Sequence, residues 1–289
     1  MASLKEIKRR IASVRGTLKI TSAMKLVSSA RLHSTQSAIE KLFPYDEELH
    51  QILRRLVAAS VAVDKRLTQS SESADKVAII AFSSNTTLCG AFNANVIRET
   101  KARIAELEAE GEQLEVFSVG RKMSDAMRKL GNCSSEDCSY LLTHPSYREA
   151  ADFANRLTKA FISGQYKRIE MIFTHFVSIS THKVSRSIYL PIDTASLASD
   201  GSPASFRDFI LEPDAESLLK ALIPRALALR IYTIILDSSA SEHAARMVAM
   251  QTASDNGEKM LQDLSLEYNK SRQKKITFEI LDLMSGLTR

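Results

Sequence analysis

Apolar residues recur at alternating steps of three and four along the first sixty or so positions. They are Leu4, Ile7, Ile11, Val14 and Leu18 and, after a polar interval, Leu32, Ile39, Leu42, Leu49, Leu53, Leu56 and Val63. A spacing of 3.5 residues is typical of a coiled-coil helix, whose narrow seam needs a partner to bury it. Pro44 lies within the segment, where its ring and missing N–H predict a kink or a break. The pattern predicts an N-terminal coiled-coil helix over residues 1–66.

After a polar linker at 68–76 the hydrophobic period changes. Short β-type runs occupy 76–82, 114–120, 137–142 and 168–176, and helical patterns near 93–109, 121–130 and 147–163 separate them. Strands that alternate with helices of this length predict βαβ units and a mostly parallel sheet. Residues 183–192 alternate in the manner of a half-exposed edge strand. We therefore expect a central α/β domain over residues 76–193.

A second loop-like linker, 193–205, precedes a helical pattern that continues almost to Thr288. This pattern predicts a C-terminal coiled-coil helix over residues 208–289, with a bend at Pro224. Its stretch 239–257 contains no Leu, Ile, Phe or Trp. Small side chains allow a partner backbone to approach closely, and two long helices separated by a whole domain pair most economically as antiparallel neighbours.

The charge is concentrated at the two ends of the chain. The net charge is +5, and residues 1–31 hold eight basic residues against Glu6 alone, while residues 270–289 hold five basic residues. Such helices could hold the phosphates of a nucleic acid or the acidic surface of a protein partner. The cations surround the N-terminal helix and no aromatic residue lies between them. The pattern therefore leaves open whether the partner is a nucleic acid or an acidic protein surface.

The candidate chemistry is sparse. Cys89, Cys133 and Cys138 are too few for a disulfide framework, and no zinc site is expected from them. The loop "SSNTTLCGAFN" (83–93) follows the first predicted strand, but with Gly90 as its one glycine it lacks a phosphate-binding fingerprint. We expect no catalytic residue, no cofactor site and no metal site. Residues 1–16 lack the apolar core of a signal peptide, and 222–236 is too short and too charged to span a bilayer.

Two long stretches resemble one known family. "IKRRIASVRGTLKITSAMKLVSSARL" (7–32) and the segment 238–286, which begins "SSASEHAARMVAMQTASDNG", are similar to the terminal helices of the gamma subunit of F-type (H+-transporting) ATP synthases of the bacterial type. Between them "LCGAFNANV", "SVGRK", "FILEPD" and "ALIPR" follow in the family's order, so the resemblance covers the whole chain. The expected fold class is α/β, with long N- and C-terminal helices forming an antiparallel coiled coil and a central Rossmann-like α/β domain of mostly parallel sheet.

The resemblance implies a central rotor shaft. Such a shaft turns inside the ring of alpha and beta subunits, couples proton-driven rotation of the c-ring to ATP synthesis on beta, and helps regulate ATPase activity and proton flow. The implied partners are the alpha and beta subunits of the catalytic head, the epsilon subunit and the membrane c-ring, with no nucleic acid and no membrane insertion. The implied place is the cytoplasmic face of the bacterial inner membrane, as a peripheral protein. A nucleotide-binding α/β protein and a basic coiled-coil nucleic-acid-binding protein are the alternatives.

The family's functional positions can be carried over residue by residue. The positions where the shaft helices meet one another or the beta subunits are Met24, Arg246, Arg272, Gln273, Thr277 and Glu279. Glu212, in "FILEPD", falls where the foot of the shaft approaches the c-ring. The sequence departs from the family's "SDRGLCGGFN" at Asn85, Thr86, Thr87 and Ala91, and it ends in a polar tip at 286–289.

Overall fold

The computed structural model describes residues 3–58, 64–70, 74, 76–131, 134–143, 145–193, 211–212 and 214–287. Val63, Cys133 and most of the linker expected at 193–205 lie outside these ranges. The chain forms two compact units, Arg31–Ala245 and the pair Met1–Ala30 with Arg246–Arg289.

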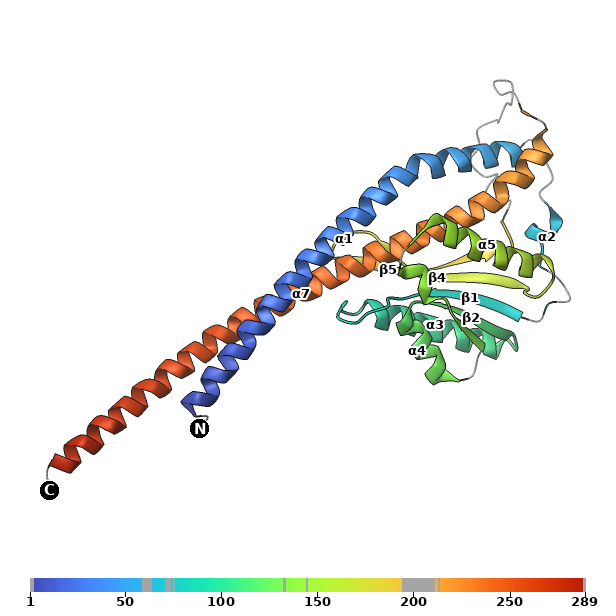
Figure 1. The fold of residues 1–289 in the computed structure, drawn as a ribbon. Coiled ribbons are helices and arrows are strands. Elements are labelled where there is room, and N and C mark those ends of the chain that lie inside the picture. Colours follow the sequence, from blue (N-terminus) through green and yellow to red (C-terminus); the bar gives the residue numbers. More distant parts are fainter. Residues whose placement is uncertain are drawn as a thin grey trace. The chain divides into compact units, whose positions relative to one another are not determined.

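Two long helices contribute to both units. Helix α1 (Leu4–Ala58) contains Pro44, and helix α7 (Ala215–Leu287) contains Pro224, yet neither helix is interrupted (Figure 1). A break at Pro44 was therefore a wrong expectation. Pro44 and Glu40, four residues before it, are both exposed, so water can satisfy the carbonyl group that the proline leaves without a donor. Pro224 and Lys220 are exposed in the same way.

The larger unit is built around a five-stranded sheet. Its strands are β1 (Lys76–Phe82), β2 (Gln113–Val119), β3 (Ser134–Asp137), β4 (Arg168–Phe176) and β5 (His182–Leu190). Their order is β3-β2-β1-β4-β5; every neighbouring pair is parallel except β4 with β5. The mostly parallel sheet with an antiparallel edge strand confirms the predicted fold class.

One strand lies earlier in the chain than its apolar run suggested. The run 137–142 predicted a strand, but β3 ends at Asp137 and residues Ser139–Leu142 form the 3-10 helix η1. The Asp137 carboxylate accepts a hydrogen bond from the Ser139 backbone N–H at 2.9 Å and contacts the Ser139 hydroxyl, which turns the chain out of the sheet. Cys138 and Leu141 are buried in this turn and not in a strand.

Helices cover both faces of the sheet. On one face, β1 packs Val77, Ile79 and Ala81 against α3 (Phe92–Ala109) and α4 (Arg121–Leu130). On the other face, the alternate residues of β1 belong to a cluster with α5 (Tyr147–Ile162), α2 (Lys65–Thr68), the second half of α1 and the first half of α7. A strand buried on both faces has a continuous apolar sequence, which explains the run "VAIIAF".

Candidate functional site

The smaller unit is an antiparallel pair made from the first part of α1 and the last part of α7. The Thr21 and Ser254 hydroxyl oxygens lie 2.9 Å apart across the pair. Leu18 faces Gly257 one turn further along. Residue numbers rise along one helix as they fall along the other, which confirms the predicted antiparallel pairing.

The polar interval of the seam is part of the interface. Thr21 and Ser28 occupy the positions that continue the 3.5-residue spacing between Leu18 and Leu32, and they are only 8% and 3% exposed. Ser28 donates a hydrogen bond to the Met24 carbonyl at 2.8 Å, so its hydroxyl is satisfied within its own helix. Apolar side chains alone do not reveal this part of the seam, whereas the 3.5-residue spacing predicts it.

Gly257 lets the helices approach each other closely. A Cβ atom at this position would lie 2.8 Å from Leu18 Cδ2, closer than side chains normally come. On either side of Gly257 in α7, Met250 and Leu264 are buried. Small residues at the seam thus produce a slender pair of helices, as the run of small side chains at 239–257 suggested.

The predicted contact residues fall into three places. Met24 is half-buried and Arg246 is buried, both in the smaller unit. Glu212 is exposed and lies in the larger unit, just before α7. The other four predicted residues, which are all exposed, are Arg272, Gln273, Thr277 and Glu279 in the last turns of α7. The structure does not gather these residues into one pocket.

The last turns of α7 extend past the paired region. Extending the register of the Thr21–Ser254 and Leu18–Gly257 contacts to the start of α1 brings Leu4 level with Ser271. Every described side chain from Arg272 to Met284 is exposed. Six of them are large and apolar, with 46–69% of their surface exposed: Ile276, Phe278, Ile280, Leu281, Leu283 and Met284. Thr277 donates to the Gln273 carbonyl at 3.0 Å, and Lys275 pairs with Glu279 at 3.5 Å. A contiguous apolar surface of this kind marks a contact site for another protein.

In the larger unit, polar contacts attach α7 to the sheet. Asp237 accepts the backbone N–H of Phe176 at 2.9 Å and lies 2.7 Å from the His175 ring nitrogen. Ser241 donates to the Thr174 carbonyl at 3.1 Å, and the buried Tyr189 hydroxyl donates to the Leu227 carbonyl at 3.1 Å. These contacts join strands β4 and β5 to three successive stretches of one helix.

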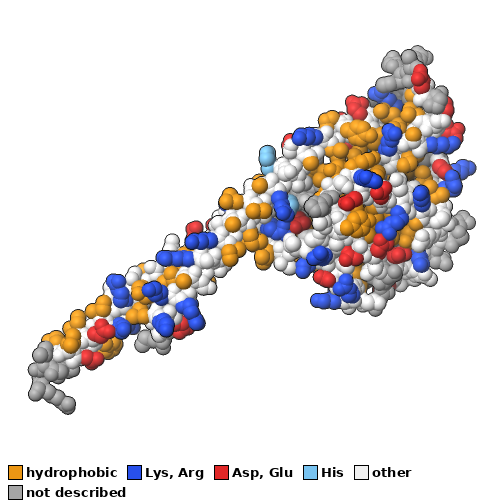
Figure 2. Space-filling view, in the orientation of Figure 1, with side chains coloured by type: hydrophobic (Ala, Val, Ile, Leu, Met, Phe, Trp, Pro, Cys, Tyr) orange, Lys and Arg blue, Asp and Glu red, His pale blue; other side chains and the backbone are white. Residues whose placement is uncertain are grey.

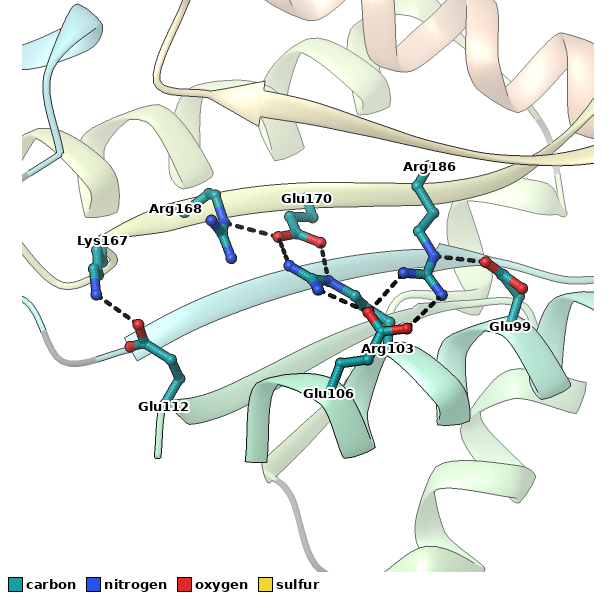
Figure 3. A network of polar contacts seen from close by, with 8 residues as sticks. All are labelled: Glu99, Arg103, Glu106, Glu112, Lys167, Arg168, Glu170 and Arg186. Atoms are coloured by element: carbon teal, nitrogen blue, oxygen red, sulfur yellow. Dashed lines mark hydrogen bonds and ion pairs between the residues drawn. The ribbon is translucent and has the colours of Figure 1, made fainter. Parts of the chain in front are cut away.

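An ion-pair network braces the opposite face of the sheet (Figure 3). Arg103 of α3 makes two hydrogen bonds of 2.8 Å to the Glu170 carboxylate of β4, and Arg168 lies 2.7 Å from the same group. Arg186 of β5 contacts Glu106 at 2.8 Å, and Glu106 also pairs with Arg103 at 2.8 Å. The network links one helix, α3, to the last two strands of the sheet, β4 and β5.

The network shifts the pKa values of its members. Hydrogen bonds from Arg186 and then Arg103 lower the pKa of Glu106 to about 2. Burial alone would raise the pKa of Glu170, but the Arg103 hydrogen bonds and the Arg168 charge outweigh it and lower that pKa. The Glu170 hydrogen bonds raise the pKa of Arg103. All three groups are therefore charged at neutral pH.

The loop after β1 uses its polar groups internally. The Ser83 hydroxyl accepts a hydrogen bond from the Met123 backbone N–H at 2.9 Å, and the Asn85 side-chain oxygen accepts one from the Arg121 backbone N–H at 3.1 Å. These two side chains of the loop cap the first turn of α4. Gly120 has a φ of 113°, and a Cβ there would lie 2.6 Å from the Ser83 hydroxyl oxygen. The loop is thus packed closely against the start of α4.

Among the described residues, no cluster of His, Cys, Asp and Glu has the composition of a metal site. Cys89 and Cys138 are free and buried. The described helices also include none long and apolar enough to cross a membrane.

Known proteins resemble this chain over nearly all its length. A family model described as ATP synthase matches residues 3–288. The ATP synthase gamma chain of Bacteroides thetaiotaomicron is 44% identical over 296 residues, covering 99% of each chain. The ATP synthase gamma chain of Flavobacterium johnsoniae is 41% identical over 286 residues, covering 99% of this chain and 98% of the relative.

Solved structures have the same fold. A chain from the mitochondrial ATP synthase of Euglena gracilis, solved with OSCP, F1 and the c-ring, superposes with a TM-score of 0.64 at 19% identity and covers 99% of this chain and 93% of that one. A chain from the central stalk and c-ring of the Tetrahymena thermophila enzyme gives a TM-score of 0.57 at 21% identity and covers 81% and 99%.

Proposed function

The chain belongs to the ATP synthase gamma chain family, and on this premise we propose that it is the central rotor shaft of an F-type ATP synthase. In this role it couples proton-driven rotation of a c-ring to ATP synthesis, and it helps regulate ATPase activity and proton flow. It has no active site of its own, since catalysis belongs to the beta subunits. A mechanical coupler acts by biasing neighbours that have several stable states.

One observation carries this proposal: α7 is a single helix of 73 residues that belongs to both compact units. In the larger unit the helix is held to β4 and β5 through Asp237, Ser241 and Leu227. In the smaller unit it is half of the antiparallel pair. A torque applied to the sheet can therefore reach the far end of α7 through continuous helical hydrogen bonds.

We assign the partners from the surfaces of each unit. The alpha and beta subunits surround the antiparallel pair, where Figure 2 shows Lys and Arg side chains, and acidic surfaces of beta complement them. The shaft contacts are Met24, Arg246, Arg272, Gln273, Thr277 and Glu279. The epsilon subunit and the c-ring bind the larger unit, with Glu212 at the c-ring. The assembly places the chain at the cytoplasmic face of a bacterial inner membrane.

The functional parts follow the order of the chain. We propose that 1–66 serves as the N-terminal coiled-coil helix, 76–193 as the α/β domain of the foot, and 208–289 as the C-terminal coiled-coil helix. The internal hydrogen bonding of the loop after β1 gives no support to a nucleotide-binding role for the α/β domain.

Reconstitution with the alpha and beta subunits of the same organism tests the proposal. We expect one copy of this chain for three alpha–beta pairs, no ATPase activity from this chain alone and turnover by the complex. Arg272→Glu should reduce turnover or coupling, whereas Lys270→Glu, an equal charge reversal at another exposed site, serves as the matched control. If an alpha–beta ring forms normally while this chain stays separate, the shaft role is wrong.

A further inference from the structure

A cavity in the larger unit is not assigned to any of the partners proposed above. Its volume is about 520 Å³, within the range of pockets that hold small organic molecules. It is lined by parts of α1, α2, β5 and α7 and by the residues that follow β5. Nine of its thirteen lining residues are apolar, among them Leu53, Ile188 and Ile223. The cavity therefore favours an aliphatic ligand.

One cation on its wall has no counter-ion among the described residues. Arg230 of α7 lines the cavity, and neither an ion pair nor a hydrogen bond joins its guanidinium to a described carboxylate. Its side chain is accessible, yet the surrounding protein lowers its pKa by desolvation. Both properties hold together in a concave site, where a group can touch solvent while protein surrounds it on most sides.

Two polar groups near Arg230, Tyr189 and His50, do not neutralise this charge. The Tyr189 hydroxyl interacts electrostatically with Arg230. Burial raises the pKa of this hydroxyl, which donates a hydrogen bond to the Leu227 carbonyl, so Tyr189 stays neutral. His50 is engaged with Asp46 through its ring nitrogen, 2.9 Å from the Asp46 carbonyl oxygen. Asp193 also lines the cavity and has an interaction of its own.

We propose that this cavity binds one fatty-acid-like carboxylate. The aliphatic chain lies among the apolar residues, and the carboxylate pairs with the Arg230 guanidinium, whose planar donors match a carboxylate in a two-point contact. A neutral alcohol of the same length gains the apolar contacts without the ion pair. A cationic amphiphile cannot form this ion pair and places its charge near that of Arg230, so it binds more weakly than the carboxylate. Binding by this site is independent of the shaft role.

The test uses the full chain alone with dodecanoate carrying 13C at its carboxyl carbon, below its micelle concentration. We expect saturable binding of one molecule per chain, with the bound carboxyl staying ionised to a lower pH than the free acid. Arg230→Gln should weaken dodecanoate binding at least about tenfold, the loss expected for a charged hydrogen bond, and leave 1-dodecanol binding unchanged. Arg225→Gln, an exposed arginine of α7 outside the cavity, is the matched control.

A second variant covers the case in which Arg230→Gln does not fold. Ile188 is 52% exposed on the cavity wall, so Ile188→Glu should fold normally and abolish dodecanoate binding by placing a negative charge beside the ligand. Absence of saturable one-to-one binding overturns the proposal, as does equal binding of dodecanoate by the folded Arg230→Gln or Ile188→Glu chain. Because the assay contains no alpha or beta subunit, either failure leaves the shaft proposal standing.

Discussion

The hydroxyl groups of Thr21 and Ser254 form a hydrogen bond of 2.9 Å across the antiparallel helix pair, where each residue is only 8% exposed. Thr21 Oγ1 also lies 3.1 Å from the Leu18 carbonyl oxygen, which can only accept, and we assign the single Thr21 hydroxyl proton to that contact. Ser254 is therefore the donor to Thr21. A buried polar contact at the seam aligns the two helices, because sliding one helix would leave both hydroxyl groups without their partner.

This geometry predicts that substitutions at Thr21 and at Ser254 lower the stability by different amounts. Thr21→Val leaves the Ser254 donor without its acceptor and should lower the free energy of unfolding by about 1–2 kcal/mol; Ser254→Ala should cost about half as much. The double variant should lie close to the wild type, since both polar groups are gone. Urea unfolding of the four chains measures the coupling, and Thr17→Val, at an exposed position of α1, should change little. Strictly additive effects would show that the hydroxyl pair has no role.

The contact between Gly257 and Leu18 predicts a conditional effect. Alanine is favoured over glycine in a helix by about 0.5–1 kcal/mol, but a Cβ at this position meets Leu18 Cδ2 at 2.8 Å. Gly257→Ala should therefore stabilise a Leu18→Ala chain by more than it stabilises the wild type. Thermal unfolding of both backgrounds measures the difference. Equal gains in the two backgrounds would mean that the helices can separate at this point at no cost.

The bond from Arg103 to Glu170 predicts a large loss on truncation. Arg103→Met should lower the free energy of unfolding by up to about 3 kcal/mol, because Glu170 is 5% exposed and keeps only the contact with Arg168. The exposed pair of Arg128 and Asp125, 3.7 Å apart, gives the control: Arg128→Gln should cost less than about 1 kcal/mol. Similar losses for the two variants would contradict a bracing role for the network.

Acid should weaken the same network in a defined direction. The folded-state pKa values of Glu106, about 2, and of Glu170 lie below the ordinary glutamate value of about 4.3. The unfolded chain then binds more protons at acid pH, so this stabilisation is complete above the ordinary pKa and is lost as the pH falls toward 2. The free energy of unfolding, measured between pH 6 and pH 3, should fall as the pH falls. Glu106→Gln should make this pH dependence less steep. If Glu106→Gln leaves the pH dependence of the unfolding free energy unchanged, Glu106 does not contribute to that dependence.

The hydrophobic pattern carried enough information for most of the fold. The 3.5-residue seam predicted the paired helices because a narrow stripe requires a partner, and the strands β1 and β4 matched their apolar runs. The seam at Thr21 and Ser28 was missed because their small polar side chains are buried through hydrogen bonds. The strand expected at 137–142 was misplaced since Asp137 and Ser139 turn the chain, and the continuity of α1 at Pro44 depends on its exposure.

Neither the ion-pair network nor the contact positions could be predicted from the local sequence pattern. Arg103 and Glu170 are 67 positions apart, and their meeting depends on how α3 crosses the sheet. The assignment of Arg272 and Glu279 came from family resemblance alone. The structure adds that they lie on an exposed part of α7 beside large apolar side chains such as Phe278.

Direct observation of rotation tests the shaft role most directly. A bead would be attached to α3 through the thiol introduced by Glu108→Cys, after Cys133→Ser; Cys89 and Cys138 are buried and stay unlabelled. The labelled chain is assembled with alpha and beta subunits that are fixed to a surface. We predict that ATP drives rotation of the bead in one direction and that removal of ATP stops it. ATP hydrolysis at the normal rate by complexes whose firmly attached beads do not turn would contradict the account.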